Sequence, residues 1–201
     1  YNNSIGLFTR GVLTTPLYYT ISGNTFTNNP TGYYMNIYSN YNDVLDNHFE
    51  SNSNGIYGLN VNYNLFSDNE FVDNTQGVFL SSGNYNNFTL NSFSGNEYGL
   101  RVNDYGRYSY IWDNTFFDND YNAYEEANAP GNNWNMDVGN YWDDFTSNPG
   151  YPKQYEIPGP GAGVDYKPMI DEDSDGYWIF EDCDDANDLA NPGMMELCRT
   201  A

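Results

Sequence analysis

The feature of this chain that most constrains its fold is an internal repeat of 22 or 23 residues that reads Asn-x-Phe-x-x-Asn-x-x-Gly. The first Asn column contains Asn24, Asn47, Asn69, Asn91 and Asn114, and the Phe column contains Phe26, Phe49, Phe71, Phe93 and Phe116. The second Asn column contains Asn29, Asn52, Asn74, Asn96 and Asn119, and the Gly column contains Gly32, Gly55, Gly77 and Gly99, with Asn122 in the fifth place. A fixed period of this length is typical of a solenoid.

The spacing of the turn residues predicts short strands rather than helices. Fragments such as Gly-Val-Phe-Leu at 77–80 are bounded by Gly and Asn, which accept the left-handed backbone of a sharp corner. A coil of about 22 residues has room for three short strands, and coils stack about 4.8 Å apart. We therefore predict an all-β fold, a right-handed single-stranded parallel β-helix of about six coils over residues 1–125. In it the Phe column forms an internal aromatic stack and the first Asn column an internal amide ladder.

Composition supports a packed core and excludes some partners. Aromatic residues make up 18 % of the 201-residue chain, a content that disordered chains lack. The 28 acidic and 6 basic residues give a net charge of −22, which argues against nucleic acid and anionic membrane surfaces as partners. No stretch approaches the roughly 18 apolar residues of a membrane span, and no signal peptide is recognisable. Because Tyr1 lies in repeat-like sequence, we expect a segment of a longer chain.

Residues 126–170 lose the repeat and gain Pro, Gly and Trp, which predicts a segment that caps the β-helix. An open coil end exposes unpaired backbone groups and apolar surface that must be covered. The aromatic side chains suited to this capping are Trp134, Tyr141, Trp142 and Phe145.

The repeat and the segments after it resemble a known group of proteins. The resemblance rests on the repeats, on Gly-Asn-Asn-Trp at 131–134, on Gly-Asn-Tyr-Trp-Asp-Asp-Phe at 139–145, and on the segments 155–159 and 165–169. Over residues 1–170 the chain resembles the parallel β-helix repeat proteins of the NosD-like and carbohydrate-binding or sugar-hydrolase type. The resemblance implies the fold, which hosts many activities.

Residues 171–201 form a third segment, in which acidic residues alternate as they do in a calcium-binding loop. Asp occupies positions 1, 3, 5 and 12 of the template and Gly176 occupies position 6, where the loop must turn sharply. The predicted calcium ligands are Asp171, Asp173, Asp175, the carbonyl of Tyr177, Asp182 and Asp184. A solvated acidic linker and a magnesium site are the alternatives.

This tail resembles the Asp-x-Asp-x-Asp-Gly-Tyr…Asp-Cys-Asp-Asp calcium-binding repeats of secreted microbial proteins, with one repeat present. Cys183 and Cys198 flank the acidic stretch 15 residues apart. A disulfide between them would close a loop worth about 3 kcal/mol in the chain-entropy model and would indicate an oxidising compartment. A pair of free thiols is the alternative.

Residue types that carry chemistry are scarce in the repeats. Copper delivery, with which NosD-like proteins are associated, needs clusters of His, Cys or Met, whereas this chain has one His, at position 48, and five scattered Met. Polysaccharide cleavage would need paired carboxylates, or calcium with a basic residue such as Arg101 or Arg107. The carboxylates in the coils are Asp43, Asp46, Asp68, Asp73, Asp104, Asp113 and Asp118, but Asp is also an ordinary turn residue. We assign no catalytic residue, and the balance is against an enzyme.

Tyrosines form a further column at Tyr41, Tyr63, Tyr85 and Tyr108, spaced by 22, 22 and 23 residues. Inside the coil they would belong to the core. Outside, they would form an aromatic strip for sugars or for another protein subunit. Asn2 and Asn87 begin glycosylation sequons.

These features predict a secreted or cell-surface structural protein, a β-helical rod with a calcium-stabilised tail that serves adhesion, a surface layer or filament assembly. Its expected partners are copies of itself or other surface proteins. The alternative is a carbohydrate-active β-helix protein, either a polysaccharide lyase or hydrolase or a sugar-binding module.

Overall fold

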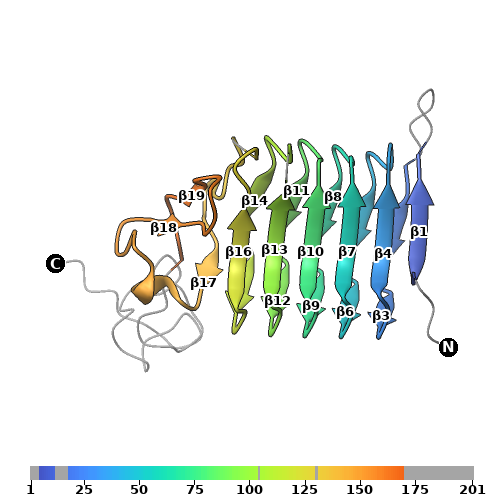
Figure 1. Ribbon diagram of the computed structural model, residues 1–201, viewed down its shortest axis with the longest axis horizontal. Coiled ribbons are helices and arrows are strands. Elements are labelled where there is room, and N and C mark those ends of the chain that lie inside the picture. The colour runs from blue at the N-terminus through green and yellow to red at the C-terminus, as the bar shows by residue number, and fades with distance from the viewer. Residues whose placement is uncertain (1–4, 12–17, 104, 130, 170–201) are drawn as a thin grey trace, which may run out of the picture. The chain divides into compact units, whose positions relative to one another are not determined.

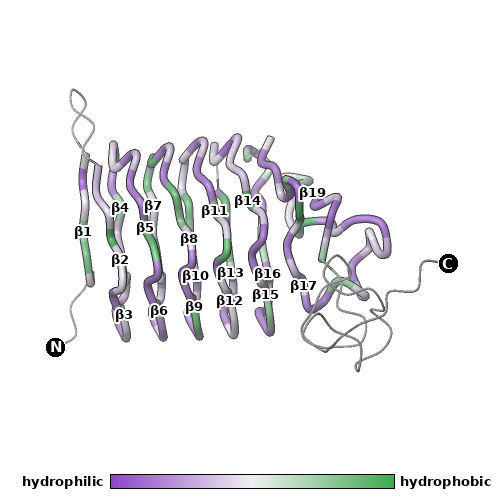
Figure 2. The backbone as a smooth tube through the Cα atoms, turned by 180° about the vertical axis from the view of Figure 1, so that it is seen from behind, coloured by the Kyte–Doolittle hydropathy of each residue, from purple (hydrophilic) through white to green (hydrophobic). Residues whose placement is uncertain are grey.

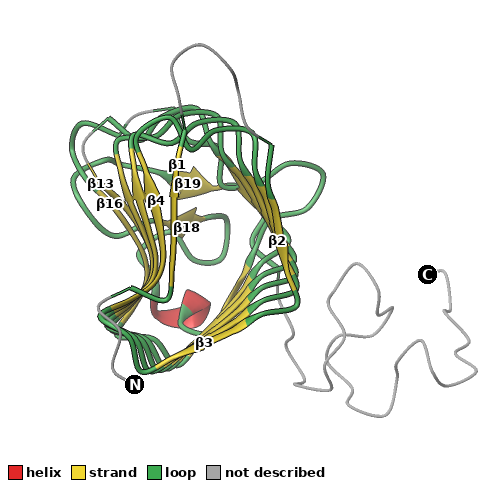
Figure 3. Cartoon of the chain, turned by 90° about the vertical axis from the view of Figure 1, so that its right-hand side faces the viewer, coloured by secondary structure: helices red, strands yellow, loops and turns green. Residues whose placement is uncertain are grey.

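The computed structural model describes residues 5–11, 18–103, 105–129 and 131–169, and it is an all-β parallel solenoid (Figure 1). The predicted fold class is therefore confirmed. In the described residues, five coils contribute one strand to each of three parallel sheets, and a sixth contributes strands to the first and third sheets only. The three sheets enclose the interior when the coils are viewed end on (Figure 3).

The first sheet runs in the order β1 (Leu7–Arg10), β4 (Thr31–Asn36), β7 (Asn54–Leu59), β10 (Gln76–Ser81), β13 (Tyr98–Asn103) and β16 (Tyr121–Glu125). The second runs β14 (Tyr110–Trp112), β11 (Asn87–Thr89), β8 (Leu65–Ser67), β5 (Asp43–Leu45) and β2 (Thr20–Ser22). The third runs β17 (Tyr141–Trp142), β15 (Thr115–Phe117), β12 (Ser92–Ser94), β9 (Glu70–Val72), β6 (His48–Glu50) and β3 (Thr25–Thr27). After β17 come a short 3-10 helix, η1 (Phe145–Ser147), and the antiparallel pair β18 (Tyr155–Glu156) and β19 (Val164–Asp165).

The sequence repeat sets the register, because equivalent residues of successive coils pair directly. Phe49 pairs with Phe71, and Phe71 with Phe93. Their rings stack inside the coil with centroids 5.0 and 4.8 Å apart and are fully buried, as the Phe column predicted. The repeat glycine makes room for this stack, since a Cβ on Gly55 would come within 2.5 Å of the Gly77 carbonyl oxygen. The apolar positions recur coil after coil along the chain (Figure 2).

The first Asn column forms the predicted internal ladder. Asn47 donates its backbone N–H and its side-chain amide to Oδ1 of Asn69, at 3.1 and 3.0 Å, and Asn69 donates in the same way to Asn91. The second Asn column forms a similar ladder at another corner. A third ladder, formed by Asn42, Asn64 and Asn86, was not predicted, although its 22-residue spacing is visible in the sequence.

The capping residues continue the core stack past the last full coil. Trp142 stacks on Phe116 with ring centroids 4.4 Å apart, and Tyr155 stacks on Trp142 at 4.1 Å. Trp134, Trp142 and Phe145 are buried, as expected for a plug. The last rings of the aromatic column are therefore covered by the cap and shielded from solvent.

The first ladder ends at a buried carboxylate in the cap. Asn114 donates to Asn140, and the backbone N–H of Asn140 donates to Oδ2 of Asp165 at 2.8 Å. Trp142 Nε1 donates to the same oxygen at 3.0 Å. Each ladder Asn donates its backbone N–H and one amide hydrogen to Oδ1 of the Asn in the next coil toward the cap. The last member therefore needs an acceptor, and Asp165 supplies it.

The other two ladders end in the same way. Asn122, which accepts from the second ladder, donates to Asp143 at 2.9 Å and to Asp144 at 2.8 Å. The third ladder continues through Ser109 to Asn132, whose amide donates to Glu125 at 2.6 Å. Carboxylates therefore terminate all three ladders at the capped end.

Candidate functional site

The tyrosine column lies on the outside of the coil, which settles the alternative left open by the sequence. Tyr41, Tyr63, Tyr85 and Tyr108, here called the tyrosine ladder, are 41 to 48 % exposed. Successive ring centroids are 5.0, 5.1 and 5.3 Å apart, with interplanar angles of 4, 5 and 21°. At one end the ring of Tyr18 contacts that of Tyr41, with centroids 5.7 Å apart, and at the other end Gly131 lies against the ring of Tyr108.

The backbone at the tyrosine ladder is unusual for a bulky residue. All four tyrosines have φ between 57 and 59°, in the left-handed region that Gly and Asn normally occupy. Such strained positions cost free energy and cluster at functional surfaces. Positive φ also occurs at other corners of the coils, for example at Ser51, Asp68 and Leu90. What distinguishes this corner is that a bulky aromatic residue occupies it in four successive coils.

The stacking decides which part of each ring faces outward. A ligand ring placed between two tyrosines would need about 7 Å between them, roughly two van der Waals contacts, and the observed spacing is 5.0 to 5.3 Å. The ring faces are therefore covered by their neighbours, and the ladder presents ring edges and hydroxyls. It offers a regular row of contacts but no open platform on which a sugar could stack.

A second row of amides runs beside the tyrosine ladder. The backbone N–H of Asn62 donates to Oδ1 of Asn40 at 2.7 Å, and that of Asn84 donates to Oδ1 of Asn62 at 2.9 Å. These Asn residues are half-buried. Arg107 takes the next place in this row, because its backbone N–H donates to Oδ1 of Asn84 at 3.2 Å. Apart from Arg107 the two rows are uncharged, in a chain with a net charge of −22.

Aromatic side chains also line the outer face of the first sheet. Tyr34 stacks on Tyr57 at 5.1 Å and Tyr57 on Phe79 at 5.4 Å. The row then reaches Arg101, whose guanidinium lies 5.3 Å from the Phe79 ring and pairs with Glu126 at 2.8 Å. Arg101 is thus held by local partners rather than directed into a catalytic site.

The carboxylates of the coils occupy corners. Asp46, Asp68, Asp73, Asp113 and Asp118 all have positive φ, as turn residues do, and Asp43 begins β5. Asp104 lies outside the described residues. His48 Nδ1 lies 2.6 Å from Oε2 of Glu70, and its Nε2 lies 3.7 Å from Oε2 of Glu50. In the described ranges, no three His, Cys, Asp or Glu side chains group together as a metal site.

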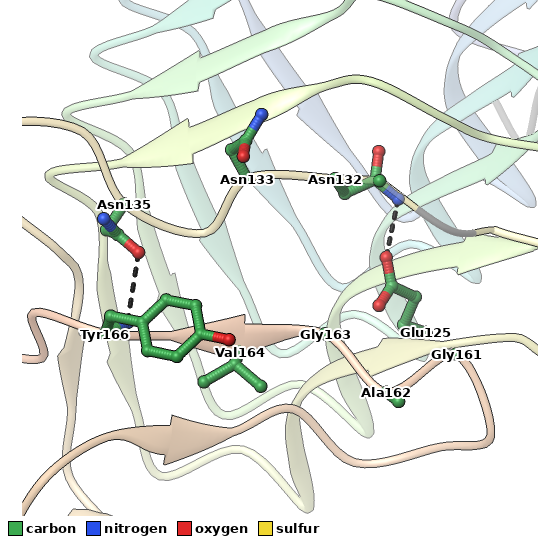
Figure 4. Close-up of a pocket in the computed structure, with 10 residues that line it drawn as sticks. Glu125, Asn132, Asn133, Asn135, Gly161, Ala162, Gly163, Val164 and Tyr166 are labelled. Carbon is green, nitrogen blue, oxygen red and sulfur yellow. Dashed lines mark hydrogen bonds between the residues drawn. The ribbon is translucent and has the colours of Figure 1, made fainter.

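The cap contains a pocket of about 370 Å³ between the last coil and the β18–β19 hairpin, here called the cap pocket (Figure 4). Its lining residues are Glu125, Gly131, Asn132, Asn133, Asn135, Gly161, Ala162, Gly163, Val164 and Tyr166. Glu125 is 1 % exposed, and burial raises the pKa of its carboxyl, opposed by nearby N–H groups of Asn132, Trp134 and Gly163. Glu125 is in register with Val102 and, one coil further back, with Leu80, so it occupies a core column that is apolar in those coils. A carboxylate at that place was the signal that the sequence analysis missed.

The residues predicted to bind metal or form a disulfide lie outside the described residues. They are Asp171, Asp173, Asp175, Tyr177, Asp182, Cys183, Asp184 and Cys198. Of the two sequons, Asn2 is also outside, whereas Asn87 is half-buried at the start of β11. Glycosylation stays a prediction. No helix in the described part of the chain has the length and apolar character needed to cross a membrane.

Comparison with known proteins identifies a family. The model of the family described as periplasmic copper-binding protein (NosD) matches residues 2–147. No curated protein matches the chain.

The expectation of calcium as cofactor is wrong, because the matching family is described as copper-binding, which points to copper. The scarcity of His, Cys and Met in the sequence argues against copper, in the opposite direction to the family description. The described residues likewise do not fit copper well. The nitrogen and sulfur side-chain donors that copper prefers are few and dispersed among the described residues. They are His48, which contacts glutamates, Met35, which is buried in β4, Met136, which is exposed in the cap, and Met169, which is buried.

Proposed function

The chain belongs to the NosD family, and from this premise and the tyrosine ladder we infer an extracytoplasmic β-helical rod whose copies associate side by side. Adhesion, a surface layer and filament assembly are the roles that such association would serve. The description of the family as periplasmic supports a place outside the cytoplasm.

The single observation that carries the proposal is the exposed, stacked and strained tyrosine ladder. Four tyrosines are held in one line by left-handed backbone and by rings about 5 Å apart, so little side-chain entropy remains to be lost on contact. Exposed aromatic residues of this kind are enriched in protein interfaces.

A second copy of the chain is the partner that the ladder fits best. A contact across a two-fold axis sets the same patch against itself, so its spacing matches by construction. Apart from Arg107 at one end, the strip of tyrosines and amides carries no charge, so the repulsion between copies acts from the acidic residues elsewhere on the molecule. Moderate salt limits the range of that repulsion to about 10 Å.

Electron microscopy of the full chain tests the proposal with a matched pair of variants. Tyr63→Ser/Tyr85→Ser removes the middle of the ladder. Phe117→Ser removes a residue that is 53 % exposed on β15, away from the ladder. We expect pairs of the wild type and of Phe117→Ser, and isolated particles of the double variant. Isolated wild-type particles at every protein and salt concentration would contradict the proposal.

Copper binding is a second candidate function, favoured by the family description alone. Because the described donors are dispersed, we expect His48→Ala to leave any copper content of the full chain unchanged. Equilibrium dialysis against Cu(I) and Cu(II), followed by metal analysis, measures this content. Stoichiometric copper in the wild type that is lost in His48→Ala would show that the β-helix itself holds the metal.

A further inference from the structure

The cap pocket contains a buried carboxylate that lacks a cationic partner. The ion pairs found in the described part of the chain involve Arg101 and His48, and neither includes Glu125. Lys167, which follows the pocket residue Tyr166, is engaged elsewhere, since its Nζ donates to the carbonyls of Met136 and Asp137 at 2.9 and 3.1 Å. A buried carboxylate is stabilised when a cation compensates its charge.

The backbone holds Glu125 firmly in the pocket wall. Glu125 ends β16. Its backbone N–H donates to the carbonyl of Pro158, and its backbone carbonyl accepts the N–H of Gly161, each at 2.9 Å. Asn132 donates to Oε1 at 2.6 Å. Gly163 passes so close that a Cβ there would collide with Oε2. The carboxylate is therefore fixed in place before any ligand arrives.

Figure 4 shows the second carboxylate oxygen of Glu125 turned away from Asn132. The orientation of Asn135, another pocket residue, is fixed because its Oδ1 accepts the backbone N–H of Tyr166 at 3.0 Å. Tyr166 lines the pocket and is 65 % exposed, so its ring is accessible to a ligand. Aromatic rings attract cations across their faces, and amide oxygens accept hydrogen bonds from ammonium groups.

We propose that the cap pocket binds a small organic cation, an ammonium group on a short polar chain, with Glu125 as its counter-ion and Tyr166 as an aromatic wall. The volume of about 370 Å³ suits a ligand of a few heavy atoms. The net charge of −22 raises the local concentration of cations around the protein. This site is independent of the tyrosine ladder.

Calorimetric titration of the full chain with ethanolamine tests the proposal, and ethylene glycol is a neutral probe of nearly the same size. We expect one saturable site for ethanolamine, weakened by salt, and no measurable binding of ethylene glycol. Equal binding of the two probes would show a polyol site and overturn the proposal, as would the absence of saturable ethanolamine binding.

Two variants connect binding to the named residues. Glu125→Gln keeps the acceptor for Asn132 but removes the charge, and we expect ethanolamine affinity to fall roughly tenfold or more. Tyr166→Ser should lower it about two- to fivefold, whereas Tyr19→Ser, an exposed tyrosine in the first coil, should leave it unchanged. Unchanged binding in a Glu125→Gln variant that melts like the wild type would overturn the proposal. If Glu125→Gln does not fold, equal affinities of Tyr166→Ser and Tyr19→Ser would do so.

Discussion

At the scale of single residues, asparagine side chains supply hydrogen bonds to buried groups at the corners of the coil, which the sheet hydrogen bonds do not reach. Asn69 is 1 % exposed, and its Oδ1 accepts two hydrogen bonds from Asn47 while its amide donates to the carbonyls of Val44 and Ser67. Each bond satisfies a backbone or amide group that would otherwise be buried without a partner. The ladder therefore joins the corners of successive coils by hydrogen bonds, as the sheets join their strands.

Truncation of one ladder residue should be costly because it leaves donors of the neighbouring coil without an acceptor. We expect Asn69→Ala to lower the free energy of unfolding by about 3 kcal/mol or more. Asn62→Ala, in the half-buried outer row, should cost about 1 kcal/mol or less. Urea unfolding followed by circular dichroism measures both, and equal losses would contradict the role given to the inner ladder.

The buried carboxylates of the cap make stability depend on pH in a defined direction. Burial raises the pKa of Glu125 and of Asp165, whose partners are Asn140, Trp142 and the backbone of Lys167. A folded-state pKa above the unfolded value, about 4, gives stability that is complete below pH 4 and is lost as pH rises through the folded pKa.

Asp165→Asn tests this dependence, because an amide oxygen still accepts hydrogen bonds but does not titrate. The wild type should become less stable between pH 4 and pH 7.5, and the variant should lose less stability over the same range. Thermal melts at a series of pH values measure the slopes. Since general charge repulsion acts on both proteins, identical slopes would contradict the contribution of Asp165.

At the scale of elements, the sequence repeat predicted the coils, the Phe stack and the first Asn ladder, because each depends only on residues that recur at the coil period. The side on which the tyrosine column lies was left open, since a corner in left-handed backbone breaks the in–out alternation of a strand. The carboxylates that terminate the ladders were missed because Glu125, Asp143, Asp144 and Asp165 act through contacts outside the repeat. The expectation of calcium rested on the spacing of acidic residues in the tail and on its resemblance to calcium-binding repeats, and the family match corrected it.

The cap should come loose as a unit when its central ring is removed. Trp142 joins Phe116 of the last coil to Tyr155 of the hairpin, so Trp142→Ala removes both stacks and a bond to Asp165. We expect a loss of about 3 to 5 kcal/mol, concentrated in the cap, because solenoid coils depend mainly on their neighbours. Relative to the wild type, the hydrogen exchange rate of the variant should increase more over residues 131–169 than over residues 43–103. A uniform increase along the chain would contradict this division.

At the scale of the whole molecule, the exposed tyrosine ladder and the strong negative charge have opposite effects on association. The ladder favours contact between copies, and the charge opposes it. Association should therefore strengthen as salt rises, because screening weakens the repulsion and leaves the contacts of the uncharged tyrosine and asparagine side chains largely unaffected. An interface made of ion pairs would show the opposite trend.

Sedimentation velocity over a series of protein and salt concentrations tests this account most directly. For the wild type and Phe117→Ser, we predict a concentration-dependent increase in sedimentation coefficient that grows with sodium chloride. Tyr63→Ser/Tyr85→Ser should remain monomeric under the same conditions. A wild-type protein that stays monomeric throughout, or a double variant that associates as the wild type does, would contradict the role of the tyrosine ladder.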